Sequence, residues 1–269
     1  MRVRRVGAVV ITVAALAAGV TACGGGGDTF VVGIKIDQPG LGQKQPDGSF
    51  KGFDVDVAKY VAKELGYKDD QIEFKEASSA NRESFIQQGQ VNAVIATYSI
   101  TDDRKKKIGF AGPYLITGQD ILTRKDDTTI NGVEDLKTKK VCGAQGSSSP
   151  KRLVEKFGEA WKGQYLTEQQ VYGACLPLLE NKQVDAISTD ATILAGFAAQ
   201  SPGKFRLVGK PFSEEKYGIG VKLEDKDLRE KINKAVEKMF ADGSWKKAVD
   251  ANFGEFGTSF TTPPAIERY

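Results

Sequence analysis

The sequence predicts an α/β protein of two lobes, each built on an open sheet with parallel strands. From Phe30 to Ala96, short β-rich runs alternate with stretches of helical period, which is the β-α-β-α-β pattern of a parallel sheet. The same alternation begins again after Thr129. The chain has 269 residues, which is enough for two modest domains with separate cores.

The first half of the chain supplies three expected strands and two helices. One helix opens at Phe53 and carries its apolar residues on one face of a 3.6-residue period until Gly66 ends it. A second helix follows Arg82 and ends near Gly89. The strands are expected at 30–36, 72–74 and 91–96.

The rest of the chain supplies the remaining elements. Strands are expected at 119–123, 140–142, 164–166, 184–189 and 217–221. Helices are expected at 150–157, 176–181, 228–240 and 245–253. The tail that begins at Gly254 is expected to be loosely held.

The amino terminus has the pattern of a secretory signal. Three arginines precede the apolar run 6–20, which at about 15 residues is shorter than the roughly 20 that a membrane helix needs. Residues 1–22 are therefore expected to be a signal peptide, and residues 23–29, which are rich in glycine, a flexible tether. A plain amino-terminal anchor is the alternative.

The net charge and the cysteine content bear on which kinds of ligand and metal site the chain could have. Removing the signal peptide takes three arginines from 38 Lys+Arg, leaving 35 against 35 Asp+Glu, so the net charge gives no case for nucleic acid. The two cysteines of the exported body, Cys142 and Cys175, suggest one disulfide, with two buried free thiols as the alternative. A zinc site is poorly supported because the chain has no histidine.

Charged and hydroxyl side chains gather where expected strands end. The run ending at Ala96 is followed by the hydroxyls of Thr97, Tyr98 and Ser99, and then by Arg104. Open α/β sheets bind ligands at the carboxyl ends of their strands, and an arginine fork suits a carboxylate. The alternative is that Arg104 opens a solvated run with the three lysines that follow it.

Two further groups follow strands of the second lobe. Asp190 comes directly after the strand 184–189 and is a candidate for an ammonium ligand, or else a helix cap for the segment beginning at Ala191. Ser147 and Ser148 precede Pro150, so free N–H groups of a helix start can meet an anion there, although serines are also ordinary capping residues.

Several of these sequence segments resemble those of a known family. The segment 96–114 resembles the T-x-T-x-x-R…F-x-x-P-Y segment of the polar amino-acid binding proteins that feed ABC transporters, bacterial solute-binding protein family 3. Gly52–Ala58 (G-F-D-V-D-V-A) and Val184–Asp190 (V-D-A-x-x-x-D) match the same family, and the resemblance covers nearly all of residues 30–255.

The resemblance implies a fold and a site. The fold is the two-lobe periplasmic-binding-protein type II, with two crossing hinge strands and the ligand in the cleft between lobes. Lobe 1 is expected to be discontinuous, with residues 30–123 and 217–255, and lobe 2 to span 124–216, leaving 256–269 as a tail. In the family, Arg104 takes the ligand α-carboxylate together with the helix start at Ser147, and Asp190 takes the ammonium.

The resemblance also implies a ligand. Ser79-Ala80-Asn81-Arg82 resembles the S-x-N-R of glutamate/aspartate binders, and Lys35 stands where those binders carry an arginine. Tyr172 stands where one such relative has a histidine. Glutamate is therefore the expected ligand, with aspartate, glutamine and asparagine as alternatives. The alternative for Lys35 is a lysine that snorkels to the surface.

The implied protein is a lipoprotein of an importer. Val20-Thr21-Ala22-Cys23 resembles a lipobox, so Cys23 is expected to carry lipid (diacylation, with palmitate) and to anchor a monomer to the outer face of the cell membrane. For this segment the alternatives are a plain signal peptide and a plain amino-terminal anchor. The expected partners are a free amino acid and the transmembrane permease subunits, without cofactor or metal. The alternatives are an amino-acid sensor and a dehydratase-like enzyme, but no nucleophile–base arrangement supports catalysis.

Overall fold

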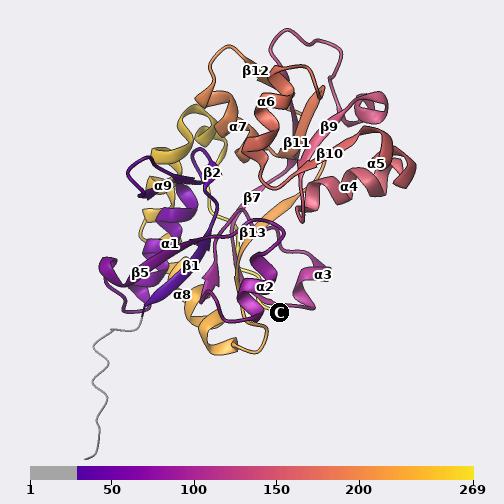
Figure 1. The fold of residues 1–269 in the computed structure, drawn as a ribbon. Coiled ribbons are helices and arrows are strands. Elements are labelled where there is room, and N and C mark those ends of the chain that lie inside the picture. The colour runs from indigo at the N-terminus through magenta and orange to yellow at the C-terminus, as the bar shows by residue number, and fades with distance from the viewer. Residues whose placement is uncertain (1–28) are drawn as a thin grey trace, which may run out of the picture.

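A computed structural model of the chain describes residues 29–269 and shows two lobes, each with a five-stranded sheet (Figure 1). The first sheet has the order β5-β1-β6-β13-β7, and the second has the order β10-β9-β11-β8-β12. The expected signal peptide and the lipidation candidate Cys23 lie outside the described residues.

The first lobe contains both ends of the described chain. Its sheet consists of β1 (Phe30–Ile34), β5 (Ile72–Glu76), β6 (Ala93–Val94), β7 (Gly109–Thr117) and β13 (Glu215–Val221). Its helices are α1 (Phe53–Glu64), α2 (Arg82–Gln87), α3 (Asp102–Lys105), α8 (Lys226–Ala241) and α9 (Ser244–Phe253), with short 3-10 turns η1 (Asp69–Gln71) and η4 (Gly254–Ser259). A small antiparallel sheet of β2 (Asp37–Gln38), β3 (Gly42–Lys44) and β4 (Phe50–Lys51) lies beside it.

The second lobe is formed by the middle of the chain. Its strands are β8 (Gln119–Arg124), β9 (Val141–Ala144), β10 (Leu166–Gln169), β11 (Ala186–Asp190) and β12 (Phe205–Leu207). Its helices are α4 (Ser148–Phe157), α5 (Glu159–Tyr165), α6 (Cys175–Glu180) and α7 (Ala191–Gln200), with η2 (Val133–Thr138) and η3 (Tyr172–Ala174). The sheet is mixed, because β8 runs antiparallel to both of its neighbours.

Helix α1 forms because its apolar residues recur with helical period. Val57, Ala58, Val61 and Ala62 are fully buried in the core of the first lobe, as the sequence pattern predicted. The chain then turns at Gly66, whose φ of 95° favours glycine. Burial of such a face, rather than helix propensity alone, stabilises a helix of this length.

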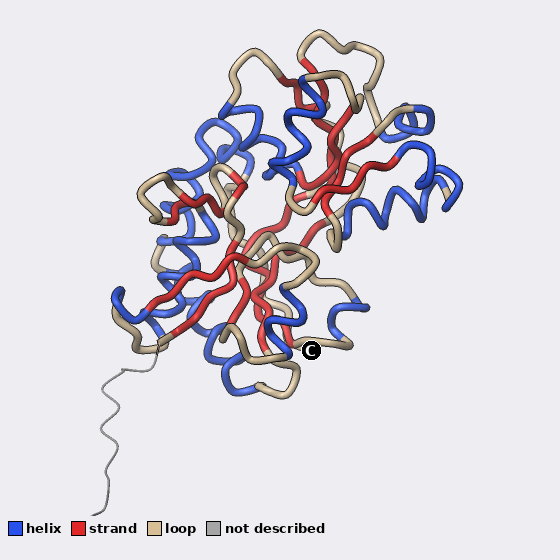
Figure 2. The backbone as a smooth tube through the Cα atoms, viewed as in Figure 1, coloured by secondary structure: helices blue, strands red, loops and turns tan. Residues whose placement is uncertain are grey.

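Two segments cross between the lobes, as Figure 2 shows. Strand β7 of the first sheet leads through Gly118 into β8 of the second, and residues 208–214 return to β13. The crossing segments lie against each other at Gly118, where an added Cβ would come 2.5 Å from the Ser213 carbonyl oxygen. Any larger residue there would push the two segments apart.

The boundary expected after Thr123 differs from the observed one. Strand β8 belongs to the second sheet, since Leu122 pairs with Ile187 of β11 and with Leu207 of β12. The return crossing ends two residues earlier than expected, because β13 begins at Glu215. A strand's sheet is set by its partners, which local patterning does not reveal.

The carboxyl-terminal tail is docked on the first lobe, so the expectation of a loosely held tail is wrong. The Glu267 N–H donates to the Gly112 carbonyl oxygen at 2.8 Å, beside β7. Arg268 forms ion pairs with Glu230 and Glu237 of α8. These contacts carry the tail past the crossing segments and along the edge of the first sheet.

The expected disulfide is present, so the alternative of two free thiols is wrong. Cys142 of β9 and Cys175 at the start of α6 are joined, with their Cα atoms 5.8 Å apart, and both residues are buried. The bond therefore ties a central strand of the second lobe to a covering helix.

Replacing Cys142 and Cys175 together by alanine is expected to lower the free energy of unfolding by roughly 2–4 kcal/mol, because the bond restricts the unfolded chain. Urea unfolding of wild type and variant measures the loss, and wild type with reductant is the control. The expectation fails if reductant leaves the wild-type midpoint unchanged, or if alkylation of the denatured, unreduced protein modifies both residues.

Candidate functional site

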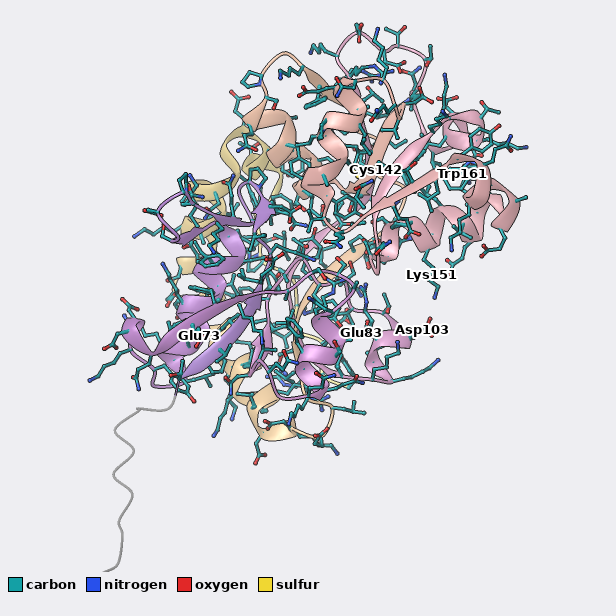
Figure 3. The ribbon with its side chains drawn as sticks, viewed as in Figure 1. Glu73, Glu83, Asp103, Cys142, Lys151 and Trp161 are labelled. Atoms are coloured by element: carbon teal, nitrogen blue, oxygen red, sulfur yellow. A yellow bond between two sulfur atoms is a disulfide. The ribbon has the colours of Figure 1, made fainter. Side chains whose placement is uncertain are left out.

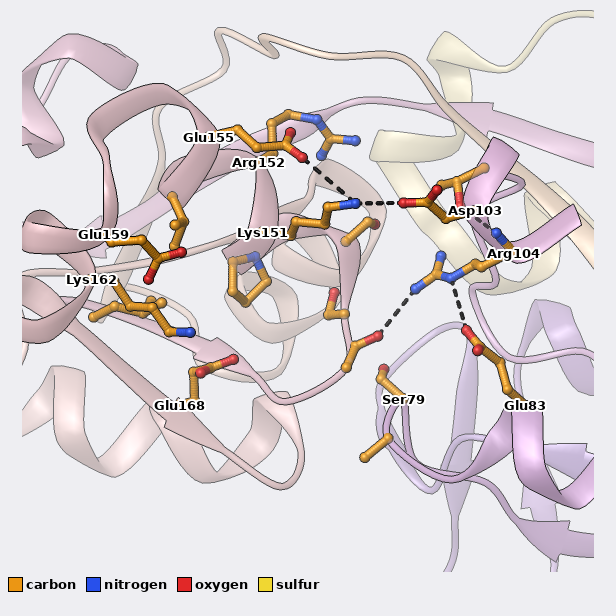
Figure 4. Close-up of a pocket in the computed structure, with 18 of the residues that line it drawn as sticks. Ser79, Glu83, Asp103, Arg104, Lys151, Arg152, Glu155, Glu159, Lys162 and Glu168 are labelled. Atoms are coloured by element: carbon orange, nitrogen blue, oxygen red, sulfur yellow. Dashed lines mark hydrogen bonds and ion pairs between the residues drawn. The ribbon is translucent and has the colours of Figure 1, made fainter. Parts of the chain in front are cut away.

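The candidate site lies between the lobes, where loops after β6 of the first lobe meet loops after β9 and β11 of the second. A groove of about 640 Å³ opens at its mouth and is lined from both lobes (Figure 4). Asp103 of α3 and Lys151 of α4 face each other across it, with Oδ2 and Nζ 2.7 Å apart (Figures 3 and 4).

The lobes are closed on one another. Besides the Asp103–Lys151 pair, a carboxylate oxygen of Asp37 accepts the N–H of Gly173 at 2.8 Å. At Gly146 the approach is so close that an added Cβ would come 2.7 Å from the Ser79 carbonyl oxygen. The Asp103–Lys151 pair itself stays exposed, whereas Arg104, Tyr172 and Asp190 are buried.

Arg104 is held between the lobes. Its Nη1 donates to the Ser99 carbonyl oxygen at 2.8 Å, and its Nη2 donates to the Gly146 carbonyl oxygen of the second lobe at 3.1 Å. Its Nε lies 3.6 Å from the Glu83 carboxylate. The short helix α3 that carries it begins at Asp102, and the hydroxyl oxygen of the preceding Thr101 accepts the Arg104 N–H as a cap.

The alternative of a solvated charge run is wrong for Arg104. The residue is only 6% exposed, whereas the side chain of Lys106, two positions on, is 75% exposed. The run thus divides into a buried arginine, the half-buried Lys105 and two exposed lysines.

Asp190 ends β11 and precedes α7, but its side chain does not cap that helix. Its Oδ2 accepts a hydrogen bond from the Tyr217 hydroxyl at 2.7 Å, and its Oδ1 is buried with no hydrogen-bond partner among the described residues. Burial and the charge of Glu215 raise the pKa of Asp190 to about 7. The helix-cap alternative is therefore not what the geometry shows.

Lys35 and Arg82 are both buried in the first lobe. Lys35 is 5% exposed, so it does not snorkel to the surface, and its Nζ donates to the Ser79 hydroxyl at 2.9 Å. Burial, and then the charge of Arg82, lower the pKa of Lys35 well below its usual value. Arg82 donates from Nη1 to the Ala96 carbonyl oxygen at 3.0 Å, and its guanidinium lies 3.8 Å from the centre of the Tyr98 ring.

Thr97 has a strained backbone that neighbouring groups hold in place. Its φ is 45°, unusual for a β-branched residue. Its N–H donates to the Asp54 carboxylate at 2.8 Å, and Tyr114 donates to the other oxygen of that carboxylate, also at 2.8 Å. Burial raises the pKa of Asp54 to about 6, partly offset by these two hydrogen bonds. Asp54 therefore fixes the loop on which Tyr98 and Ser99 follow.

The second lobe contributes the start of α4. Ser147 precedes the helix, and its hydroxyl oxygen accepts from the Ser149 N–H at 3.4 Å and from the Tyr172 hydroxyl at 2.9 Å. Ser148 is the first residue of α4 and lines the groove with Ser147. Tyr172 is buried and so acts on this helix start through Ser147.

Of the predicted side chains, Ser79, Arg104, Ser147 and Ser148 line the groove. The others are buried behind it and do not line it: Lys35, Arg82, Thr97, Tyr98, Ser99, Tyr172 and Asp190. The structure also adds two residues that the sequence did not single out. Asp54 was noted only as part of a helix start, and Tyr217 only as a strand residue. Neither residue has a local sequence signal for its role, because its hydrogen-bond partners lie at least 25 residues away in the chain.

Other kinds of site find no support in residues 29–269. That part of the chain contains no group of histidine, cysteine or acidic residues arranged to hold a metal ion. Nor does it contain a helix of sufficient length and apolar character to cross a membrane.

Two open sheets joined by two crossing segments, with a polar cleft between them, define the type II periplasmic-binding-protein fold. The chain belongs to the bacterial extracellular solute-binding proteins, family 3, whose family model matches residues 30–255.

Individual relatives differ in the ligand that they are named for. The chain is 41% identical to the glutamate-binding protein GluB of Corynebacterium glutamicum, over 93% of this chain and 91% of that protein. It is 37% identical to the ABC transporter glutamine-binding protein GlnH of Bacillus subtilis, over 81% and 78%. An ancestral arginine-binding protein bound to arginine superposes with a TM-score of 0.78 at 36% identity, covering 84% of this chain and 98% of that one.

Proposed function

We propose that the chain is the substrate-binding component of an ABC importer, that it captures an acidic amino acid, glutamate above others, and that it delivers this ligand to a membrane permease. The observation that carries the proposal is a set of three buried cations whose hydrogen bonds go to uncharged oxygens. Lys35 donates to a hydroxyl, and Arg82 and Arg104 each donate to two carbonyl oxygens. Buried charge without a counter-charge is costly, so a ligand with more than one carboxylate fits this lobe.

The nearby acids do not satisfy these cations. Asp54 accepts from Tyr114 and from a backbone N–H. One oxygen of Asp37 accepts from the N–H of Gly173, and the other is buried without a partner among the described residues. Burial, and then the charge of Arg82, still lower the pKa of Lys35 well below its usual value, although the charges of both acids raise it. Glu83 reaches Arg104 only at 3.6 Å and is shared with Lys107. An anionic ligand would therefore add counter-charge that the protein itself supplies only in part.

Each charge of glutamate has a proposed partner in the cleft. The α-carboxylate is assigned to Arg104, with Ser99 and the helix start at Ser147 beside it. The ammonium is assigned to the free Oδ1 of Asp190. The side-chain carboxylate is assigned to Lys35 and Arg82. The remaining proposed contacts are Ser79, Thr97, Tyr98, Ser148 and Tyr172.

The charges in the cleft distinguish among the ligands for which the relatives are named. A glutamine side chain is neutral and would leave Lys35 and Arg82 without a counter-charge. An arginine side chain is cationic and would be repelled by both. The relative named for glutamate is therefore the one whose ligand best fits the residues of this chain.

The proposal includes attachment to the membrane. Cys23 is proposed to carry lipid and so to hold a monomeric binding protein near its permease on the outer face of the membrane. Mass spectrometry of the native amino terminus tests this, and an unmodified terminus downstream of Cys23 contradicts it.

Ligand selectivity tests the assignment of the side-chain carboxylate. Arg82→Met is expected to weaken L-glutamate binding by at least roughly tenfold, about 1.4 kcal/mol, and L-glutamine binding by much less, because only the acid uses the cation fully. Lys35→Met is expected to act in the same direction more mildly. Isothermal titration of wild type and variants with glutamate, aspartate, glutamine and asparagine measures these losses of affinity.

The exposed Lys44 supplies the matched control, since Lys44→Met removes a lysine from the same lobe outside the cleft. Thermal unfolding of each variant checks the fold, because Arg82 also holds the Ala96 carbonyl oxygen. Equal losses for glutamate and glutamine in both variants would show that these cations are structural, and the acidic-ligand assignment would then fail.

A further inference from the structure

A tyrosine of the first lobe holds the candidate ammonium-binding carboxylate of the second. Tyr217 lies on β13 and is fully buried. Its hydroxyl lies 2.7 Å from Oδ2 of Asp190 and 2.9 Å from Oγ1 of Thr192, and both of those residues belong to the second lobe.

The direction of these hydrogen bonds follows from their chemistry. An ionised carboxylate can only accept, so the Tyr217 proton goes to Asp190. The Thr192 hydroxyl must then donate to the Tyr217 oxygen. The chain of bonds ends at Oδ2 and leaves Oδ1 of Asp190 buried without a partner among the described residues.

The backbone around Tyr217 is tied to the other half of the site. Tyr217 forms an isolated β-bridge with Ser99, and the N–H of Gly218 donates to the Tyr98 carbonyl oxygen at 2.9 Å. The Ser99 carbonyl oxygen is the group that accepts from Arg104. One strand residue therefore contacts both the loop that orients Arg104 and the carboxylate of Asp190.

We propose that Tyr217 is a positioning residue for ligand binding, whose hydroxyl orients the Asp190 carboxylate so that Oδ1 is left to accept an amino acid's ammonium. This inference rests on the proposed function at one point, namely that the ammonium which Asp190 binds belongs to an amino acid. The contact between Tyr217 and Asp190 involves only groups of the protein.

The charges around Asp190 make its ionisation sensitive to this hydrogen bond. Glu215, on the same strand as Tyr217, raises the pKa of Asp190, whereas Arg152 of α4 and Arg82 of α2 lower it. Tyr172 of η3 also interacts electrostatically with Asp190. With burial the pKa is about 7, so losing one donor to the ionised form should raise it further and lower the ionised fraction at neutral pH.

The first arm of the test needs no ligand. Carboxyl-carbon NMR of Asp-labelled protein, with the Asp190 signal assigned from Asp190→Asn, gives the Asp190 titration midpoint. Tyr217→Phe is expected to raise this midpoint by about one unit, a typical consequence of losing a hydrogen bond to a charged form. Tyr60→Phe is the matched control, since it removes a tyrosine hydroxyl that bonds Asp242 at the surface of the same lobe.

The second arm measures binding of L-glutamate, L-glutamine and L-arginine between pH 6 and 8.5. The three share the α-ammonium, so Tyr217→Phe should weaken whichever of them binds wild type by roughly tenfold at pH 6 and by less at pH 8.5, where Asp190 ionises again. Thr192→Val removes the donor to the Tyr217 oxygen. It should also weaken binding more at pH 6 than at pH 8.5, but by a smaller factor.

The outcomes separate the two proposals. The positioning role of Tyr217 is overturned if Tyr217→Phe leaves the Asp190 titration midpoint unchanged. It is also overturned if the variant's affinity differs from that of wild type by the same factor at every pH. If none of the three amino acids binds wild type, the proposed function fails, and the NMR arm alone decides whether Tyr217 holds Asp190. Should Tyr217→Phe not fold, the midpoint and pH profile of Thr192→Val decide the matter.

Discussion

Replacing Arg104 by alanine is expected to reduce the affinity for L-glutamate by roughly 30-fold or more while the lobes stay folded. Truncating one partner of a buried charge pair costs roughly 2 to 5 kcal/mol, much of it from leaving the other charge unpaired. Here the ligand α-carboxylate would lose its fork. The Ser99 and Gly146 carbonyl oxygens would also lose their shared donor, which now connects the two lobes. Isothermal titration calorimetry at pH 8 measures the loss.

Lys106→Ala is the control for Arg104→Ala, because it removes a cation from the exposed end of the same segment. That variant should bind L-glutamate as wild type does, since exposed ion pairs contribute little. A loss below tenfold for Arg104→Ala, with the Lys106 variant unchanged, would remove Arg104 from the proposed site.

Replacing Asp190 by asparagine is expected to weaken L-glutamate binding about as much as Arg104→Ala does. The same substitution is expected to make the folded protein more stable at pH 8. Binding should fall by roughly 2 to 5 kcal/mol because the ammonium loses its counter-charge. The folded-state pKa of Asp190 is raised to about 7 from an ordinary value of 3.8, so the folded state holds the proton more tightly than the unfolded chain. Asp190 therefore favours folding at pH values below 3.8, and this contribution is lost as pH rises through 7.

Two pH dependences follow for Asp190→Asn. Wild-type affinity for L-glutamate should rise between pH 6 and 8 as Asp190 ionises, and the variant should show no such rise. Without ligand, the variant should gain thermal stability over wild type at pH 8 and less at pH 5. The exposed Asp126 gives the matched control, Asp126→Asn. A variant that is less stable than wild type at pH 8 would contradict the raised pKa.

Sequence periodicity predicts the elements of this fold better than their partners. Helix α1 and strand β11 lie within two residues of their predicted bounds, because each has a regular apolar pattern and a clear terminator. Strand β7 was not predicted, since Gly112 and Pro113 interrupt its nine residues. The sheet to which β8 belongs, and the docking of the tail, depend on contacts between segments that are distant in the chain.

The same division applies to the candidate site. Arg104 and Asp190 could be singled out from charge at strand ends and from resemblance to a family. The groups that hold them could not, because these are backbone carbonyls, as at Gly146, or ordinary strand residues, as at Tyr217. Such positioning groups have no characteristic residue type or spacing.

The discontinuity of the first lobe has a consequence for biosynthesis. Strand β13 lies between β6 and β7 in the first sheet and, among the strands of residues 29–269, is the only one that pairs with β7. A chain made from its amino terminus therefore contains every strand of the second lobe, through Leu207, before it contains β13. The second lobe can complete its sheet first, while the first lobe keeps an open edge on β7. Until β13 is made, the nascent first lobe therefore exposes unpaired strand edges, which are the part of a sheet most prone to aggregation.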